Sequence, residues 1–133
     1  MTPTDLHERL DHAGHLADAR GPGVYALAVA VPDSVDSIQR ARLSVADHPF
    51  PDDMADQLAA AERVVYVGES GHVYDRLMDH ARGEVRRASL LRAFAVTDVV
   101  GVWPGERTGV AERDRARALS DAKTVCYANG ELF

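Results

Sequence analysis

Tyr66, Gly68, Arg76 and His80 lie close together in one stretch of the chain, residues 62–83. An apolar run ends in Tyr-Val-Gly, the chain turns, and a helical pattern follows that carries the arginine and the histidine. Residues four apart share one face of a helix, and this face borders the apolar stripe that packs on a sheet. A planar guanidinium suits bidentate binding of phosphate oxygens. The spacing therefore predicts that Arg76 and His80 share a face turned toward a sheet, where the guanidinium could bind an anion.

Tyr25 and an acidic helix further along supply the remaining candidates. Residues 23–25 read Gly-Val-Tyr inside a β-compatible run, and the helical pattern of residues 109–122 offers both Glu112 and Asp114. Glu112 falls on the apolar arc of that helix, whereas Asp114 falls on its polar side. We therefore take Glu112 as the acidic residue that faces the body of the protein and keep Asp114 as the alternative.

In this order and spacing, the two tripeptides, the arginine, the histidine and the acidic helix resemble the GIY-YIG nuclease domain. The resemblance covers residues 22 to about 122. It implies an α+β fold, with a small antiparallel three-stranded sheet flanked by helices. It also implies a metal-dependent endonuclease that hydrolyses DNA phosphodiester bonds in repair, recombination or the biology of a mobile element or virus.

The resemblance also assigns roles to the residues. Tyr25 would be the general base, with its pKa, near 10 in the free residue, lowered by Arg76 and a divalent metal. Tyr66 would bond to the phosphate or to Tyr25, and Arg76 would hold the scissile phosphate. His80 would bond to a phosphate oxygen or orient a tyrosine.

The metal and the DNA backbone would be bound by further residues. Glu112 would hold Mg²⁺ or Mn²⁺, since a lone carboxylate suits an ion that keeps several waters. Gly68 would let the backbone approach the substrate. The arginines after the motif helix would form a track for DNA, although a solvated helix end explains them almost as well: Arg82, Arg86 and Arg87.

Two features depart from the family pattern. About forty residues separate Tyr25 from Tyr66, so residues 32–61 form an insertion that could cover the site, contact substrate or bind a protein partner or a second copy of the chain. Glu69 lies where a phosphate would bind and would repel it unless a metal or high salt offsets its charge. A catalytically inactive module that binds nucleic acid or protein is therefore the alternative.

The elements that must position these residues can be outlined from the pattern. We expect a single domain over residues 1–133, with an N-terminal helix within residues 1–20 that Thr4 caps. Strands are expected at residues 24–31, 62–68 and 95–103, and residues 123–128 could add an edge strand.

The charge and cysteine content of the chain indicate the environment in which the protein works. The net charge is −6, and Lys123 is the single lysine among 15 basic residues. This resembles proteins of salt-loving archaea and their viruses, although a merely acidic mesophilic protein is the other interpretation. In molar salt, contacts between basic residues and phosphate contribute little affinity, so net acidity is weaker evidence against DNA than usual. The single cysteine, the polar opening residues and apolar runs too short to cross a bilayer predict a cytoplasmic location without a membrane span.

Overall fold

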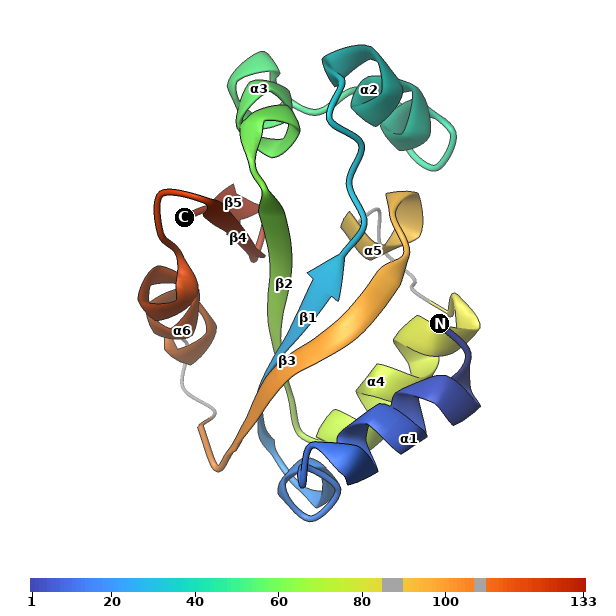
Figure 1. The fold of residues 1–133 in the computed structure, drawn as a ribbon, viewed down its shortest axis with the longest axis vertical. Helices are drawn as coiled ribbons and strands as arrows, with labels where there is room; N and C mark the ends of the chain where they lie inside the picture. Colours follow the sequence, from blue (N-terminus) through green and yellow to red (C-terminus); the bar gives the residue numbers. More distant parts are fainter. Residues whose placement is uncertain (85–89, 107–109) are drawn as a thin grey trace.

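The computed structural model describes residues 1–84, 90–106 and 110–133 and shows an α+β arrangement in which helices flank a five-stranded mixed sheet (Figure 1). The strand order is β3-β1-β2-β4-β5. β1 pairs antiparallel with both β2 and β3, whereas β4 runs parallel to β2. The strands are β1 (Gly23–Val29), β2 (Arg63–Ser70), β3 (Val96–Pro104), β4 (Thr124–Ala128) and β5 (Glu131–Leu132).

The expected α+β class is confirmed, but the expected three-stranded antiparallel sheet describes only β3, β1 and β2. The chain leaves β3, forms a helix and returns beside β2, which makes β4 a parallel neighbour rather than an edge strand. β5 then pairs antiparallel with β4 and forms the edge. The apolar side chains of Cys126 and Ala128 explain this position, because both are fully buried against the valines of β2.

The helices are α1 (Pro3–His12), the short 3₁₀ helix η1 (Asp18–Arg20), α2 (Val35–Leu43), α3 (Asp52–Ala60), α4 (Val73–Arg82), α5 (Leu90–Ala93) and α6 (Ala111–Leu119). α1 is capped by Thr2 in a capping box with Asp5, not by Thr4. It ends at His12, soon followed by Gly14 with φ +77°. Within the described residues, no helix combines the length and the apolar character that a membrane span needs.

The two faces of the sheet bury different side chains, because neighbouring residues of a strand point to opposite faces. α6 covers one face, where it packs on Val24, Ala26, Val65 and Val67. The other face carries Tyr25 and Tyr66 and is covered at one end by α1 and α4, and at the other by α2, α3 and α5 (Figure 1). Tyr66 packs against both of these groups of helices.

The insertion at residues 32–61 contains α2 and α3, which pack together beyond one end of the long strands (Figure 1). Its apolar side chains Ile38, Phe50 and Leu58 are buried against Val29 and Val64, the end of the β1–β2 pair from which the insertion leaves. The insertion is therefore part of the packed body, and its inner face continues the side of the sheet that bears the tyrosines.

Candidate active site

Tyr25 and Gly68 are register partners across the β1–β2 pair, and the tyrosine ring lies over the glycine. A Cβ atom at Gly68 would lie 2.6 Å from the Tyr25 hydroxyl oxygen and 2.7 Å from the ring carbon that bears it. Tyr25 is 2% exposed and cannot move aside easily. The glycine therefore makes room for the tyrosine. The Tyr25 ring occupies the space that a side chain at Gly68 would need, and the approach of the Gly68 backbone to a substrate stays a prediction.

His80 connects α4 to the two tyrosines of the sheet. Its Nε2 lies 2.8 Å from the Tyr25 hydroxyl oxygen. The His80 ring centroid is 5.7 Å from that of Tyr25 and 5.8 Å from that of Tyr66, and the tyrosine centroids are 6.3 Å apart. The structure thus brings these three predicted residues together, and of the two roles considered for His80, orientation of a tyrosine is the one that this contact supports.

Burial keeps both tyrosines in the neutral form. It raises the pKa of Tyr25 well above the usual range, Tyr66 and Glu112 add to the rise, and the Arg76 guanidinium opposes it. Burial is also the largest cause of the raised pKa of Tyr66, followed by the charge of Glu112. The expected lowering of the Tyr25 pKa by Arg76 is therefore outweighed by the removal of the phenol from water.

His80 is the base in this group that is neutral at physiological pH. Burial first, and then the charge of Arg76, lowers the pKa of the imidazole to about 4, against a partial opposing effect of Asp79. A neutral imidazole carries one proton, so its Nε2 can accept the hydrogen bond that the Tyr25 hydroxyl donates. In that tautomer Nδ1 holds the proton, and this buried nitrogen has no hydrogen-bond partner among the described residues.

Arg76 occupies the solvent side of the same face of α4. Its side chain is exposed, and it influences the pKa of Tyr25, Tyr66 and His80. Within the described part of the chain, Arg76 has no ion pair and no hydrogen-bond acceptor, and the nearby Asp79 pairs with Arg82 instead. A guanidinium beside three neutral rings, with its donors unused, is available to an anionic group.

Glu112 reaches the site from the first turn of α6. β4 pairs with β2 only as far as Val67, and beyond that point the backbone of Glu69 hydrogen-bonds to the Glu112 carboxylate. Burial, followed by the charge of Glu69, raises the pKa of Glu112. Asp114 is exposed and pairs with Arg117 at 3.5 Å. Of the two acidic candidates, Glu112 is thus the one that interacts with the tyrosines.

The surroundings of Glu112 fit a divalent cation. The second carboxylate, Glu69, has a buried Oε2 without a hydrogen-bond partner among the described residues, and its charge opposes ionisation of Glu112. A cation between or beside these oxygens would satisfy the buried atom and remove the repulsion. No group of three or more metal-ligating side chains was found in residues 1–84, 90–106 and 110–133, so the remaining ligands would be waters and substrate oxygens.

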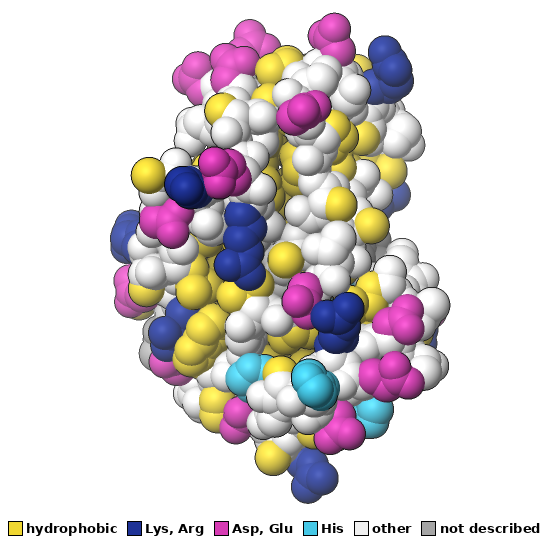
Figure 2. All heavy atoms as spheres, in the orientation of Figure 1, with side chains coloured by type: hydrophobic (Ala, Val, Ile, Leu, Met, Phe, Trp, Pro, Cys, Tyr) yellow, Lys and Arg dark blue, Asp and Glu magenta, His cyan; other side chains and the backbone are white. Residues whose placement is uncertain are grey.

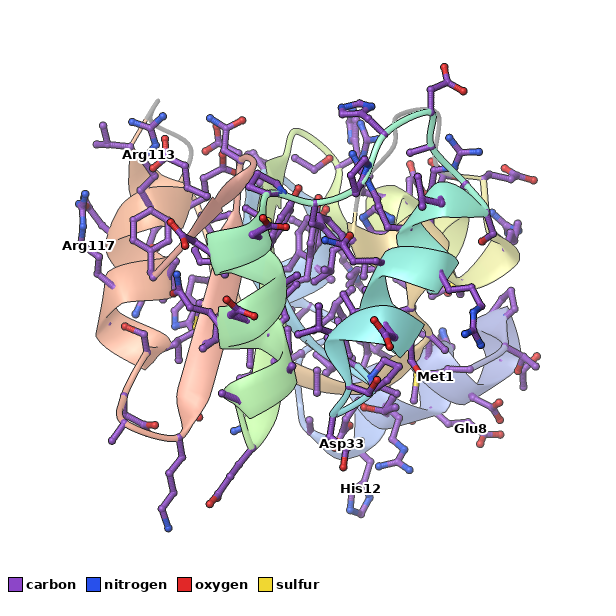
Figure 3. The ribbon with its side chains drawn as sticks, turned by 90° about the horizontal axis from the view of Figure 1, so that it is seen from above. Met1, Glu8, His12, Asp33, Arg113 and Arg117 are labelled. Carbon is purple, nitrogen blue, oxygen red and sulfur yellow. The ribbon has the colours of Figure 1, made fainter. Side chains whose placement is uncertain are left out.

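The predicted DNA track receives little support. Arg82 lies on a different side of α4 from Arg76, where it pairs with Asp79 at 3.8 Å and lines a hollow of about 330 Å³ between α1 and α4. Arg86 and Arg87 fall outside the described residues. Arg113 and Arg117 of α6, labelled in Figure 3, contact the C-terminal segment: Arg113 pairs with Glu131 of β5 at 3.6 Å, and the Arg117 guanidinium lies 5.2 Å from the Phe133 ring centroid.

Tyr127 is the neighbour of the site that sequence reasoning missed. It follows Cys126 in β4, where it is the register partner of Tyr66, and its ring stacks on that of Tyr66 with the centroids 6.0 Å apart. The residues before and after it gave no chemical pattern. A parallel pairing of β2 with β4 would have revealed it, because residues in register on parallel strands share a face.

Comparisons with protein-family models, with curated proteins and with solved structures found no significant match. The geometry of Tyr25, Tyr66, Arg76, His80 and Glu112 is therefore what supports a function. These side chains come from three separate segments, the β1–β2 pair, α4 and α6, and each of them affects the pKa of at least one other or contacts it directly.

Proposed function

We propose that the protein is a metal-dependent endonuclease that hydrolyses DNA phosphodiester bonds. The observation that supports this is the Tyr25–His80 hydrogen bond of 2.8 Å, which lies near Arg76, an arginine without an ion pair among the described residues, and within the electrostatic reach of Glu112. A phosphodiester hydrolase needs a proton acceptor for water, a donor for the phosphoryl oxygens and stabilisation of the leaving oxygen. This group of residues offers the first two from its own side chains.

Proton transfer would run through Tyr25 to His80. The raised pKa of Tyr25 makes a free phenolate rare at neutral pH, so the hydroxyl must lose its proton as it accepts one from water. His80 Nε2 is positioned to accept that proton, because the imidazole is neutral and already within hydrogen-bond distance. Tyr25 would then return to its neutral form, and the proton of the water would reside on His80.

Arg76 would hold the scissile phosphate. Its donors have no partner within the described residues, and it lies close enough to both tyrosines to oppose the rise of their pKa. A bound phosphate would thus meet the guanidinium on one side and the Tyr25 and Tyr66 hydroxyls on the other. Tyr66, whose hydroxyl interacts with that of Tyr25, would donate a hydrogen bond to a phosphate oxygen.

Glu112 and Glu69 would hold a divalent metal, Mg²⁺ or Mn²⁺. When bound, such an ion supplies Lewis-acid stabilisation of the charge that develops on the phosphate and the leaving oxygen. The buried Glu69 oxygen without a partner and the repulsion between the two carboxylates support this assignment. Glu69, expected to repel DNA, would thereby become part of the charge balance of the site.

The test is the nicking of supercoiled plasmid and branched DNA in Mg²⁺ or Mn²⁺ and molar KCl. We expect the wild type to nick, and Tyr25→Phe, Arg76→Ala and Glu112→Ala to lose about a hundredfold or more in rate, as is typical when a proton-transfer or charge-stabilising group is removed. Asp114→Ala is the matched control for Glu112→Ala, since it removes an exposed carboxylate from the same helix turn. Equal loss in both α6 variants would contradict the assignment.

A non-catalytic module that binds nucleic acid or protein is the alternative. The observation in its favour is the burial that keeps Tyr25 protonated, together with a pair of carboxylates beside the presumed phosphate site. In this case wild type and variants would be equally inert with either metal. Arg76→Ala would still weaken DNA binding, which fluorescence anisotropy measures.

A further inference from the structure

Tyr127 packs beside Tyr66 on the face of the sheet that carries the candidate site. The two residues are register partners in the parallel pairing of β2 with β4. Their rings are stacked, with an angle of 22° between the ring planes and centroids 6.0 Å apart. Tyr127 is 8% exposed, whereas Tyr66 is only partly buried. The more deeply buried ring therefore supports the ring that reaches the site.

Packing determines where the Tyr66 ring lies. Across β1 its register partner is Leu27, and its edge contact with His80 has an interplanar angle of 74°. On the β4 side the stack with Tyr127 limits rotation of the ring out of this position. Tyr127 is the aromatic neighbour of Tyr66 that is not itself part of the proposed reaction, so it can be changed without removing a reacting group.

Tyr127 packs with apolar side chains of the insertion in one buried cluster. Tyr127 belongs to the same buried cluster as Ile38, Phe50 and Leu58 of residues 32–61. Phe50 is fixed in turn by a stack with Phe94, with centroids 6.5 Å apart, and by the Arg42 guanidinium 4.7 Å above its ring. Tyr66 itself packs against this cluster, so it shares one packed group with Tyr127 and the buried side chains of the insertion.

The outer face of the insertion does not suit DNA. Figure 2 shows acidic side chains gathered over the outer ends of α2 and α3. The exposed acidic residues of the insertion are Asp33, Asp36, Asp47, Asp52, Asp53 and Asp56. Such a surface repels phosphates. Contact with DNA is therefore the role of the insertion that this charge disfavours, while its inner side chains pack in the cluster that contains Tyr127.

We propose that Tyr127 is a positioning residue that holds the Tyr66 ring in its working orientation, from within the buried cluster that it shares with the insertion. This inference rests on the proposed nuclease function for its effect on rate, but the placement of Tyr66 can be measured without it. If the ring is displaced by about 1 Å, loss of rate can reach about a hundredfold. A residue that only fills the core would be replaceable by leucine.

The test compares Tyr127→Phe, which keeps the stack, with Tyr127→Leu, which removes it. In protein labelled with 3-fluorotyrosine, ¹⁹F NMR reports on Tyr66 directly. We expect the Tyr66 resonance to shift in Tyr127→Leu and to stay near its wild-type position in Tyr127→Phe. Single-turnover nicking should fall about tenfold or more in Tyr127→Leu, with unchanged DNA affinity, and be largely retained in Tyr127→Phe.

The matched control is Cys126→Ala, which removes a buried side chain from the neighbouring position of β4 but on the opposite face of the sheet. It should leave the Tyr66 resonance in place. An unchanged Tyr66 signal in Tyr127→Leu, or an equal shift in Cys126→Ala, would overturn the inference. If the wild type did not cleave DNA, the nuclease proposal would fail, while the ¹⁹F comparison would still decide whether Tyr127 positions Tyr66.

Discussion

Burial shifts the pKa values of Tyr25 and His80, the two members of a hydrogen-bonded pair, in opposite directions. Removal from water raises the pKa of the phenol and lowers that of the imidazole, so both are neutral over a wide pH range. The neutral Tyr25 hydroxyl and the neutral His80 Nε2 are 2.8 Å apart, so a proton can pass between them. Neither group has to be buried as an ion before the transfer. The pair is thus suited to accept a proton only when a substrate and a cation change the charges around it.

His80 should make folding stability depend on pH. Its pKa is about 4 in the folded protein and near 6.5 when unfolded, so between these values the unfolded chain binds a proton that the folded chain does not. The free energy of unfolding should therefore rise with pH from about 4 to about 6.5, by up to about 3 kcal/mol, and then level off with respect to this group.

Urea denaturation from pH 4.5 to 7.5 measures this. His80→Gln should show a smaller rise than the wild type, because its side chain does not titrate. His12→Gln, which removes an exposed histidine of α1, is the control for the loss of a histidine as such. Parallel curves for wild type and His80→Gln would show that His80 is not held neutral by the fold.

α4 brings the guanidinium and the imidazole to the sheet, and both of its ends are defined by neighbouring residues. Its first residue, Val73, is fully buried and its backbone N–H bonds to the carbonyl of Gly21. At the other end Gly83 takes a left-handed conformation with φ +74°, and its N–H bonds to the carbonyl of His80. His80, which contacts Tyr25, thus lies in the last turn of the helix, whose final residue is Arg82.

Gly83→Ala should destabilise the protein by about 1 kcal/mol, because a Cβ is disfavoured in the left-handed region. Gly21→Ala is a matched control, since Gly21 ends η1 with φ −127° and has open space around its Cα. Denaturation midpoints in urea compare the two. A larger loss of stability in Gly21→Ala than in Gly83→Ala would indicate that the C-terminal end of α4 does not depend on Gly83.

The molecule as a whole carries six more negative than positive charges, and arginine supplies all but one of the basic residues. Most of the ion pairs among the described residues join exposed side chains, which contribute little individually. Repulsion among the remaining carboxylates should therefore weaken the folded state at low ionic strength. The acidic composition that the chain shares with salt-adapted proteins thus predicts that salt stabilises the fold.

Raising KCl from about 0.05 M to about 1 M should increase the midpoint of thermal unfolding, because the Debye length falls to a few ångströms and the repulsion is screened. Differential scanning calorimetry measures the midpoint. Sucrose at matched osmolality separates screening from general exclusion of a solute. A midpoint that rises equally with sucrose, or that does not rise with KCl, would contradict a charge-based origin.

The spacing of apolar residues along the chain was sufficient to predict the strands and the helix that depend only on residues close together in sequence. The β-branched runs predicted β1, β2 and β3, and helical spacing predicted α4 and placed Arg76 and His80 on one face toward the sheet. The same spacing distinguished Glu112 from Asp114, because an apolar arc must face the body of the protein. These features follow from side-chain periodicity, which any stretch of the chain carries by itself.

Long-range packing decided the rest. The parallel return of β4, the stack of Tyr127 on Tyr66 and the Tyr25 ring over Gly68 join residues that lie far apart in the chain, so no local period encodes them. The rise that burial causes in the pKa of Tyr25 was missed for the same reason. Its charge partners could be listed from the chain, but the depth of burial that outweighs them exists only once the helices close over the sheet.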